Sequence, residues 1–216
     1  HANSEPLSLW YGAGVTGNAI LSLASTEING GSDVSNITTS ARFDNGRYII
    51  NGSKWFISNA MVADAFLVVC RTSDKGSIFD FTVFLVPAKN TGVSVKKLNT
   101  IGLVGAPIGE LNFVDVVVGK ENILGSKGMG MPMTIKQFEK ERLSLSIRAV
   151  SMSPYYIKYF QRLFLAACYE KYTQLKLLTV LKTYEVKIRR LKRFNFALAQ
   201  ARESGADFGG SGAFSK

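Results

Sequence analysis

Histidine is almost absent from this sequence, since His1 is the only one among 216 residues. Zinc sites that use histidine and Ser-His or Cys-His catalytic pairs are therefore excluded, and we expect no metal site. Cysteine is nearly as scarce, with Cys70 and Cys168 alone. Two cysteines do not make a disulfide framework, so we expect a reducing, intracellular compartment, either the cytoplasm or the mitochondrial matrix.

Long apolar runs are also missing. No run approaches the roughly 20 residues that a helix needs to cross a bilayer, so we expect no membrane span. The first residues, HANSEPLS, show no basic segment followed by an apolar run, and we expect no signal peptide. The sequence does not begin with Met, which indicates a processed product or a fragment. With 46% hydrophobic and 19% charged residues, the chain can still bury a core.

Acidic residues are scarce in the last third of the sequence. Residues 151–216 hold 12 Lys and Arg against 4 Asp and Glu, so they carry +8 of the total charge of +10. Such a basic surface can attract nucleic acid, acidic lipid or a phosphate-rich cofactor. The favoured interpretation is the solvated face of helices. Nucleic-acid binding through residues 158–193, where a basic run precedes Phe194 and Phe196, is the weaker alternative.

Short β-type runs fill the sequence from about residue 20 to 124. Runs such as AFLVVCRT and FTVFLVPA are separated by turn sequences, and Asn45-Gly46 predicts a tight hairpin between two of them. Because no helical stretches lie between these runs, they predict an antiparallel barrel or sandwich.

Helical periodicity replaces this pattern after residue 130. Apolar residues from 133 to 152 predict an amphipathic helix, and Pro154 suits the first turn of a second helix. The expected fold class is α+β, an antiparallel β-barrel or sandwich followed by a helical C-terminal region. The predicted boundaries are an N-terminal remnant or loop at 1–19, the β domain at 20–130, and the helical region with a flexible tail at 131–216.

Near the start, Gly12, Gly14 and Gly17 spell the G-x-G-x-x-G of dinucleotide-binding folds. That fingerprint requires a strand before the glycines and a helix after them. The segment that follows, NAILSLASTE, reads instead as a strand, and no β-α-β alternation follows. We interpret the glycines as a surface loop, with a dinucleotide site as the alternative.

Later segments carry a more specific ordered pattern: LASTEINGGSDVSNITTSA at 23–41, NGRYIINGSKWFISNA at 45–60, ELNF at 110–113, ENILG at 121–125 and QFEKERL at 137–143. This order resembles the acyl-CoA dehydrogenase family over about residues 20–150. The resemblance implies an antiparallel β-barrel middle domain, FAD as cofactor, an acyl-CoA substrate, an electron-transfer flavoprotein-like acceptor and a homo-oligomer.

The resemblance also implies site residues in the β domain. Thr26 would bond the pyrimidine edge of the flavin, Ser32 would meet the pantetheine, and Phe56 and Ser58 would lie beside the flavin ring and its N5. The full cofactor set is Leu23, Ser25, Thr26, Gly31, Ser32, Phe56, Ile57 and Ser58. A flat, largely apolar ring with one polar edge suits aromatic cover and a few hydroxyl donors. The alternative is that Thr26 and Ser58 satisfy backbone groups and Phe56 is core.

The QFEKERL helix carries the implied chemistry. In a branch resembling the isovaleryl- and long-chain-type enzymes, Glu141 occupies the position of the base that takes the α-proton of the acyl-CoA. Phe138, Glu139 and Arg142 match positions that contact the substrate, where Arg142 would favour the negative CoA. On spacing alone, Glu-Lys-Glu-Arg is a solvated helix face with ion pairs.

Several features of the family are not recognisable: the long N-terminal helical domain, the R-x-x-F-G segment after the base-bearing helix, and a later Gly-Gly-rich helix start and G-T turn. The leading hypothesis is therefore flavin-dependent dehydrogenation of an acyl-CoA thioester, by a fragment or a degenerate member. The alternative is a non-catalytic scaffold that binds flavin, CoA or a protein partner.

Overall fold

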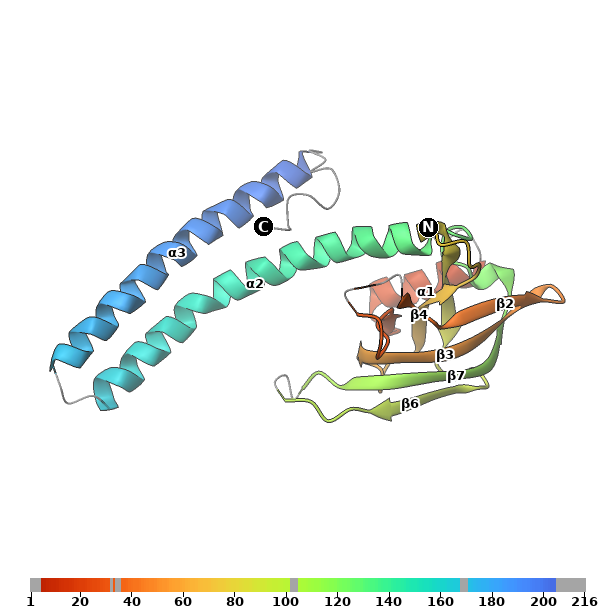
Figure 1. Ribbon diagram of the computed structural model, residues 1–216, viewed down its shortest axis with the longest axis horizontal. Coiled ribbons are helices and arrows are strands. Elements are labelled where there is room, and N and C mark those ends of the chain that lie inside the picture. Colours follow the sequence, from red (N-terminus) through yellow and green to blue (C-terminus); the bar gives the residue numbers. More distant parts are fainter. Residues whose placement is uncertain (1–4, 32, 34–35, 102–104, 168–170, 205–216) are drawn as a thin grey trace. The chain divides into compact units, whose positions relative to one another are not determined.

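A computed structural model describes residues 5–31, 33, 36–101, 105–167 and 171–204 (Figure 1). The chain divides into two compact units, His1–Ile135 and Lys136–Lys216. The first unit holds the sheet and the second holds most of two long helices. The predicted domain boundaries differ slightly from this division and remain a prediction.

Seven strands form one curled, mixed sheet in the first unit (Figure 1). They are β1 (Leu21–Ala24), β2 (Ser40–Asp44), β3 (Arg47–Ser58), β4 (Ala65–Arg71), β5 (Phe81–Pro87), β6 (Val93–Lys97) and β7 (Ile108–Val118). Their order is β1-β4-β2-β3-β7-β6, and β5 lies on the other side of β4. The hairpin predicted at Asn45-Gly46 joins β2 and β3, and both turn residues have positive φ, which these residue types tolerate.

The α+β class is confirmed, and the pairing within the sheet adds a detail. Most pairs are antiparallel, but β4 runs parallel to β1 over Leu21–Ala24 and parallel to β2 at the single pair Ser40 and Arg71. The sheet is therefore mixed, a half-barrel rather than a purely antiparallel one. The parallel pairing was not visible in the sequence because the paired strands are not consecutive in the chain.

The main core fills the concave side of the sheet. Residues of matching parity on neighbouring strands supply it, among them Tyr48, Ile50, Phe66, Phe84 and Phe113. The strands β4 and β5 are buried along nearly their whole length because their other face packs against Leu7, Ile37 and Met131. This double burial explains why both strands read as continuous apolar runs.

The N-terminal segment corrects one expectation. Residues Glu5–Thr16 form the helix α1, so the surface loop predicted across Gly12 and Gly14 is wrong. Gly17 follows the helix at φ +77, a conformation that favours glycine, and the chain then enters β1. Leu7 is buried and Trp10 packs beside it against β4 and β5. The helix forms because these apolar residues cover the sheet, an effect that local glycine content does not report.

The second unit consists of most of α2 (Gly130–Ala167) and all of α3 (Lys171–Glu203), which run antiparallel (Figure 1). The prediction that Pro154 starts a new helix is wrong, since Pro154 lies inside α2. Proline lacks an N–H, so one helical hydrogen bond to Val150 is lost, and the length of the helix on both sides compensates. The helices contact each other through Asn195, which is buried and exchanges hydrogen bonds with Ser146 at 2.9 and 3.2 Å.

Candidate functional site

Two segments predicted to meet a flavin lie side by side in the first unit. The backbone N–H of Trp55 donates to the Thr26 carbonyl at 2.8 Å, and the Ser22 hydroxyl donates to the Ser58 carbonyl at 2.5 Å. These bonds join β1 and the segment after it to the second half of β3. We call the surface formed by Thr26, Phe56 and Ser58 the candidate edge.

A bulge in β3 shapes this edge. The register of β3 against β7 shifts between Lys54, which faces Leu111, and Ile57, which faces Gly109. Trp55 and Phe56 therefore stand opposite the single residue Glu110. Bulges of this kind redirect a side chain, and they are common beside functional sites.

Phe56 is the strained residue of the bulge. Its φ is +56, in the left-handed region where a bulky aromatic residue is an outlier that costs of order 1–3 kcal/mol. Its side chain is 58% exposed, and its ring meets that of Trp55 edge-on with centroids 6.1 Å apart. The fold thus holds an aromatic ring outward at an energetic cost. The alternative that Phe56 belongs to the core does not fit this exposure.

Beneath the candidate edge lies a buried ion pair. Lys54, with a fully buried side chain, places its Nζ 2.8 Å from Oε1 of Glu27 and 3.1 Å from the Ser25 carbonyl. The other hydrogen bonds to Glu27 come from the backbone N–H groups of Thr38 and Thr39 at 2.8 and 2.9 Å, and from the Thr38 hydroxyl at 2.7 Å. Every oxygen of this buried carboxylate is thus satisfied.

The surroundings of Glu27 keep it ionised. Burial by itself would raise its pKa, but the Lys54 charge and the hydrogen bonds from Lys54, Thr38 and Thr39 lower the pKa from 4.5 to about 2. For Lys54, burial lowers the pKa while the charge of Glu27 opposes that change. Because the Lys54 Nζ donates to two acceptors, the charged pair is the state that this geometry supports. Cys70 lies near the pair, and burial raises the pKa of its thiol to about 12.

The predicted cofactor residues divide by exposure. Ser58 and Gly31 are exposed and Thr26 is half-buried, so these join Phe56 at the surface. Ser25 and Ile57 are buried, and Leu23 packs against the cluster on the convex side of the sheet. The buried side chains of Ser25 and Ile57 leave only backbone groups to reach a ligand, whereas Leu23 is half-buried. Ser32 lies outside the described residues.

The predicted substrate and base residues all lie on α2, in the second unit. Glu141 and Arg142 are exposed, and Phe138 and Glu139 are half-buried. Phe138 and Arg142 are four residues apart and so share one helix face, next to Glu141. The basic run at 189–193 lies on α3, mostly exposed.

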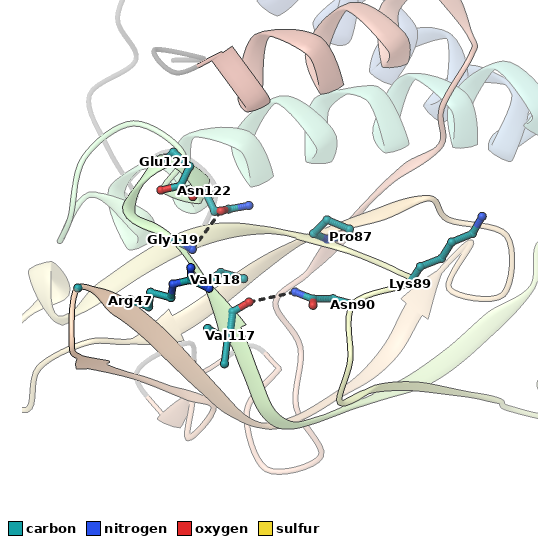
Figure 2. Close-up of a pocket in the computed structure, with 10 residues that line it drawn as sticks. Arg47, Pro87, Lys89, Asn90, Val117, Val118, Gly119, Glu121 and Asn122 are labelled. Atoms are coloured by element: carbon teal, nitrogen blue, oxygen red, sulfur yellow. Dashed lines mark hydrogen bonds between the residues drawn. The ribbon is translucent and has the colours of Figure 1, made fainter.

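A cavity of about 620 Å³ occurs elsewhere in the first unit (Figure 2). It is lined by the start of β3, the residues after β5 and the end of β7, and Figure 2 shows Asn90 donating to the Val117 carbonyl at 3.1 Å within it. None of the predicted site residues lines this cavity, which lies at the end of β3 opposite to Phe56. We therefore place the candidate site at the candidate edge because of its side-chain chemistry, and not at this cavity.

Two residues of the site were missed by the sequence analysis, Glu27 and Lys54. Both stood in quoted motifs, but neither was given a role. A signal existed for Lys54, because it has the same strand parity as Tyr48 and Ile50, which point into the core. For Glu27 the signal is its position next to Thr26, a predicted flavin contact. The residues that bind the Glu27 side chain lie 11 to 27 positions away in the sequence.

Within the part of the chain that the structure describes, no three His, Cys, Asp or Glu side chains are grouped so that they could hold a metal ion. Over the same residues, no helix is long and apolar enough to cross a membrane.

Comparisons with known proteins cover both units. Residues 22–116 match the family model described as acyl-CoA dehydrogenase, middle domain. Over 129 residues, the chain is 33% identical to cyclohexane-1-carbonyl-CoA dehydrogenase of Syntrophus aciditrophicus (strain SB). The matched region is 59% of this chain and 34% of that protein.

Solved structures extend the similarity to the helices. An acyl-CoA dehydrogenase from Geobacillus kaustophilus matches with a TM-score of 0.84 at 26% identity, covering 95% of this chain and 57% of that one. The FAD complex of PigA matches in fold with a TM-score of 0.82 at 22% identity, covering 94% of this chain and 55% of that one. The chain thus spans about a third of the length of its curated relative and somewhat more than half of these solved chains.

Proposed function

From the match of residues 22–116 to the acyl-CoA dehydrogenase middle-domain model, we propose that the chain is a member of this family, binds FAD at the candidate edge and takes part in the α,β-dehydrogenation of an acyl-CoA thioester. The observation that carries the proposal is Phe56, held outward in a left-handed bulge between Thr26 and Ser58. The residues fit the cofactor, since an aromatic ring and two hydroxyl groups match a flat ring with one polar edge.

In the proposed reaction, FAD when bound supplies the acceptor for the hydride that leaves the β-carbon of the substrate. The Glu141 carboxylate takes the proton from the α-carbon, so that a carbon–carbon double bond forms between the two. Thr26 and Ser58 orient the flavin, and Phe56 covers its ring. Arg142 contributes positive charge toward the CoA phosphates. Glu141 is exposed in its own unit, so its role as a base requires the bound acyl chain to exclude water.

The first test is FAD binding by the chain. After incubation with FAD and desalting, the visible flavin bands should remain with the protein, and F56A should retain less flavin. Phe79→Ala is the matched control, because Phe79 is exposed to a similar extent (56% against 58%) but lies outside the candidate edge. A colourless wild-type chain, or equal losses in F56A and F79A, would contradict the proposal.

The second test concerns the base. A panel of straight and branched acyl-CoA thioesters should bleach the bound flavin of the wild-type chain, and Glu141→Gln should slow that bleaching by about 100-fold or more. Glu185→Gln on α3 is the control and should change the rate little. Electrons should pass onward to an electron-transfer flavoprotein-like acceptor. Rates within a few fold of wild type in Glu141→Gln would exclude this role.

A second function is favoured by one observation, the exposed basic run at 189–193 on α3, which could dock a partner. On this reading the chain is a non-catalytic flavin- or CoA-binding scaffold. Flavin that is retained by the chain but is not bleached by any acyl-CoA would support it. The homo-oligomer and the intracellular location expected from the sequence also remain proposals.

A further inference from the structure

The Glu27–Lys54 pair stands at a junction of three segments. Glu27 belongs to the segment after β1, and its backbone forms a bridge with Gly30 through bonds of 2.9 and 3.2 Å. Its side chain binds the backbone of Thr38 and Thr39, which precede β2. Lys54 lies on β3, immediately before the bulge that carries Phe56. One buried carboxylate therefore ties all three segments together.

These bonds surround Thr26. The residue before it is held by Lys54 through the Ser25 carbonyl at 3.1 Å, and the residue after it, Glu27, is held on its side chain and its backbone. The Thr26 carbonyl itself accepts the N–H of Trp55 in the bulge at 2.8 Å. The segment that carries Thr26 and the segment that carries Phe56 are thus both held by the Glu27–Lys54 pair.

A requirement for stability alone does not account for such a pair. Burying two charges costs desolvation energy, and well-packed apolar residues of similar volume often stabilise a core as well or better. The charges contribute directional hydrogen bonds, because each hydrogen bond to an ionised group fixes the positions of the atoms that it joins.

We infer that Glu27 and Lys54 are positioning residues, which hold Thr26 against the β3 bulge and thereby set the geometry of the candidate edge. The consequence for flavin affinity rests on the proposed function, whereas the consequence for backbone order does not. The two can therefore be tested separately on the same protein.

The chain contains a matched control in Asp80. This carboxylate is also buried, at 1% exposure, and it accepts the Ser73 hydroxyl and the backbone N–H groups of Lys75 and Ser77 at 2.8 and 2.9 Å. Its partners all lie in the connection between β4 and β5, away from the candidate edge. Asp80→Asn should lower stability as Glu27→Gln does, without loosening Thr26.

The experiment measures amide hydrogen exchange in the full chain without flavin. The Val68 amide serves as the reference, because its protection reports opening of the core. In Glu27→Gln, protection at the Trp55 amide should fall about tenfold to a hundredfold further than protection at Val68. A fall of this size is expected for the loss of hydrogen bonds to a charged group. In Asp80→Asn, the two amides should change together. Trp55 protection that follows Val68 in Glu27→Gln would overturn the inference.

FAD affinity is then measured for the same variants. The affinity should fall about tenfold or more in Glu27→Gln relative to Asp80→Asn, because protein groups that are displaced from the flavin contribute little binding energy. If the wild-type chain binds no FAD while Trp55 is selectively exposed, the positioning role stands and the proposed function fails. If FAD binds equally to both variants while exchange differs, the edge is not where the flavin binds.

A second variant keeps the inference testable if Glu27→Gln does not fold. Glu27→Gln/Lys54→Met removes both charges and so leaves no unpaired one in the core. This double variant should fold and still lose Trp55 protection selectively, because the bond to the Ser25 carbonyl is gone. A double variant with wild-type Trp55 protection would overturn the inference.

Discussion

The two units of this chain are built on different principles. The sheet unit buries large apolar side chains such as Phe66, Phe84 and Phe113 on the concave side of its own sheet. In the helical unit, the buried apolar side chains among the described residues are Val150 and Ile157, while Tyr155, Tyr159, Phe194 and Phe196 are exposed. The first unit is thus stabilised from within, whereas the second presents apolar surface along its helices.

Charge sharpens the contrast. Residues 151–216 carry +8, so the helical unit combines exposed aromatic residues with a basic surface. In the sheet unit, the distinctive charges are the buried Glu27 and Lys54, which pair with each other. Charge therefore lies on the surface in one unit and is paired in the interior in the other.

The largest effect should come from breaking the core of the sheet unit. Phe84 is fully buried, with its ring 4.9 Å from that of Tyr48, so Phe84→Ala should lower the free energy of unfolding by about 3–5 kcal/mol. Phe194→Ala, at an exposed position of α3, should change it by less than about 0.5 kcal/mol. Urea unfolding followed by circular dichroism checks both. Equal losses would mean that the helical unit has a core of its own.

A smaller effect concerns pH. The pKa of Glu27 in the folded chain is about 2, below its value of 4.5 without these contacts. The stabilisation is therefore complete above about pH 5 and is lost as the pH falls toward 2. Urea midpoints measured from pH 7 to 2 should show this loss, and Glu27→Gln should show a weaker one. The neighbouring Cys70 thiol stays neutral over this range, because burial raises its pKa to about 12.

The remaining slope in Glu27→Gln should come largely from Asp80, whose pKa is lowered by the hydrogen bonds from Ser73, Ser77 and Lys75. A Glu27→Gln curve parallel to that of wild type would show that the buried pair contributes no pH dependence.

The smallest effect should come from the helical unit. Asn195→Ala removes the hydrogen bonds between α3 and Ser146 of α2, and should cost about 1 kcal/mol. Ser153→Ala is the control, because the Ser153 hydroxyl bonds the Ala149 carbonyl of its own helix. The helical signal at 222 nm during urea unfolding reports both. A loss in Ser153→Ala as large as in Asn195→Ala would argue against a specific contact between the helices.

Much of the fold could be predicted because local patterns report it. Short apolar runs and the turn residues between them indicated where the strands lie. The Asn45-Gly46 hairpin followed from the φ values that these residue types accept. Two predictions failed where a long-range contact or helix length prevailed over a local signal. Gly12 and Gly14 lie in α1 because that helix packs on β4 and β5, and Pro154 lies within α2.

The candidate site divides in the same way. The motifs pointed to Thr26, Phe56 and Ser58, which lie on segments that hydrogen bonds join, but exposure separates these from Ser25 and Ile57, which are buried. Glu141, Phe138, Glu139 and Arg142 are assigned by motif position alone, so their roles remain predictions.

The sequence by itself determined the resemblance to a family, the class of the fold and the segments proposed to form the site, because these depend on patterns within short stretches of chain. Only the tertiary structure decided how the segments meet: the left-handed bulge at Phe56, the mixed pairing of β4, and the buried bond between Glu27 and Lys54. The physical reason is that a bulge or a buried charge is stable only when distant partners supply its hydrogen bonds, and those partners do not show in local sequence.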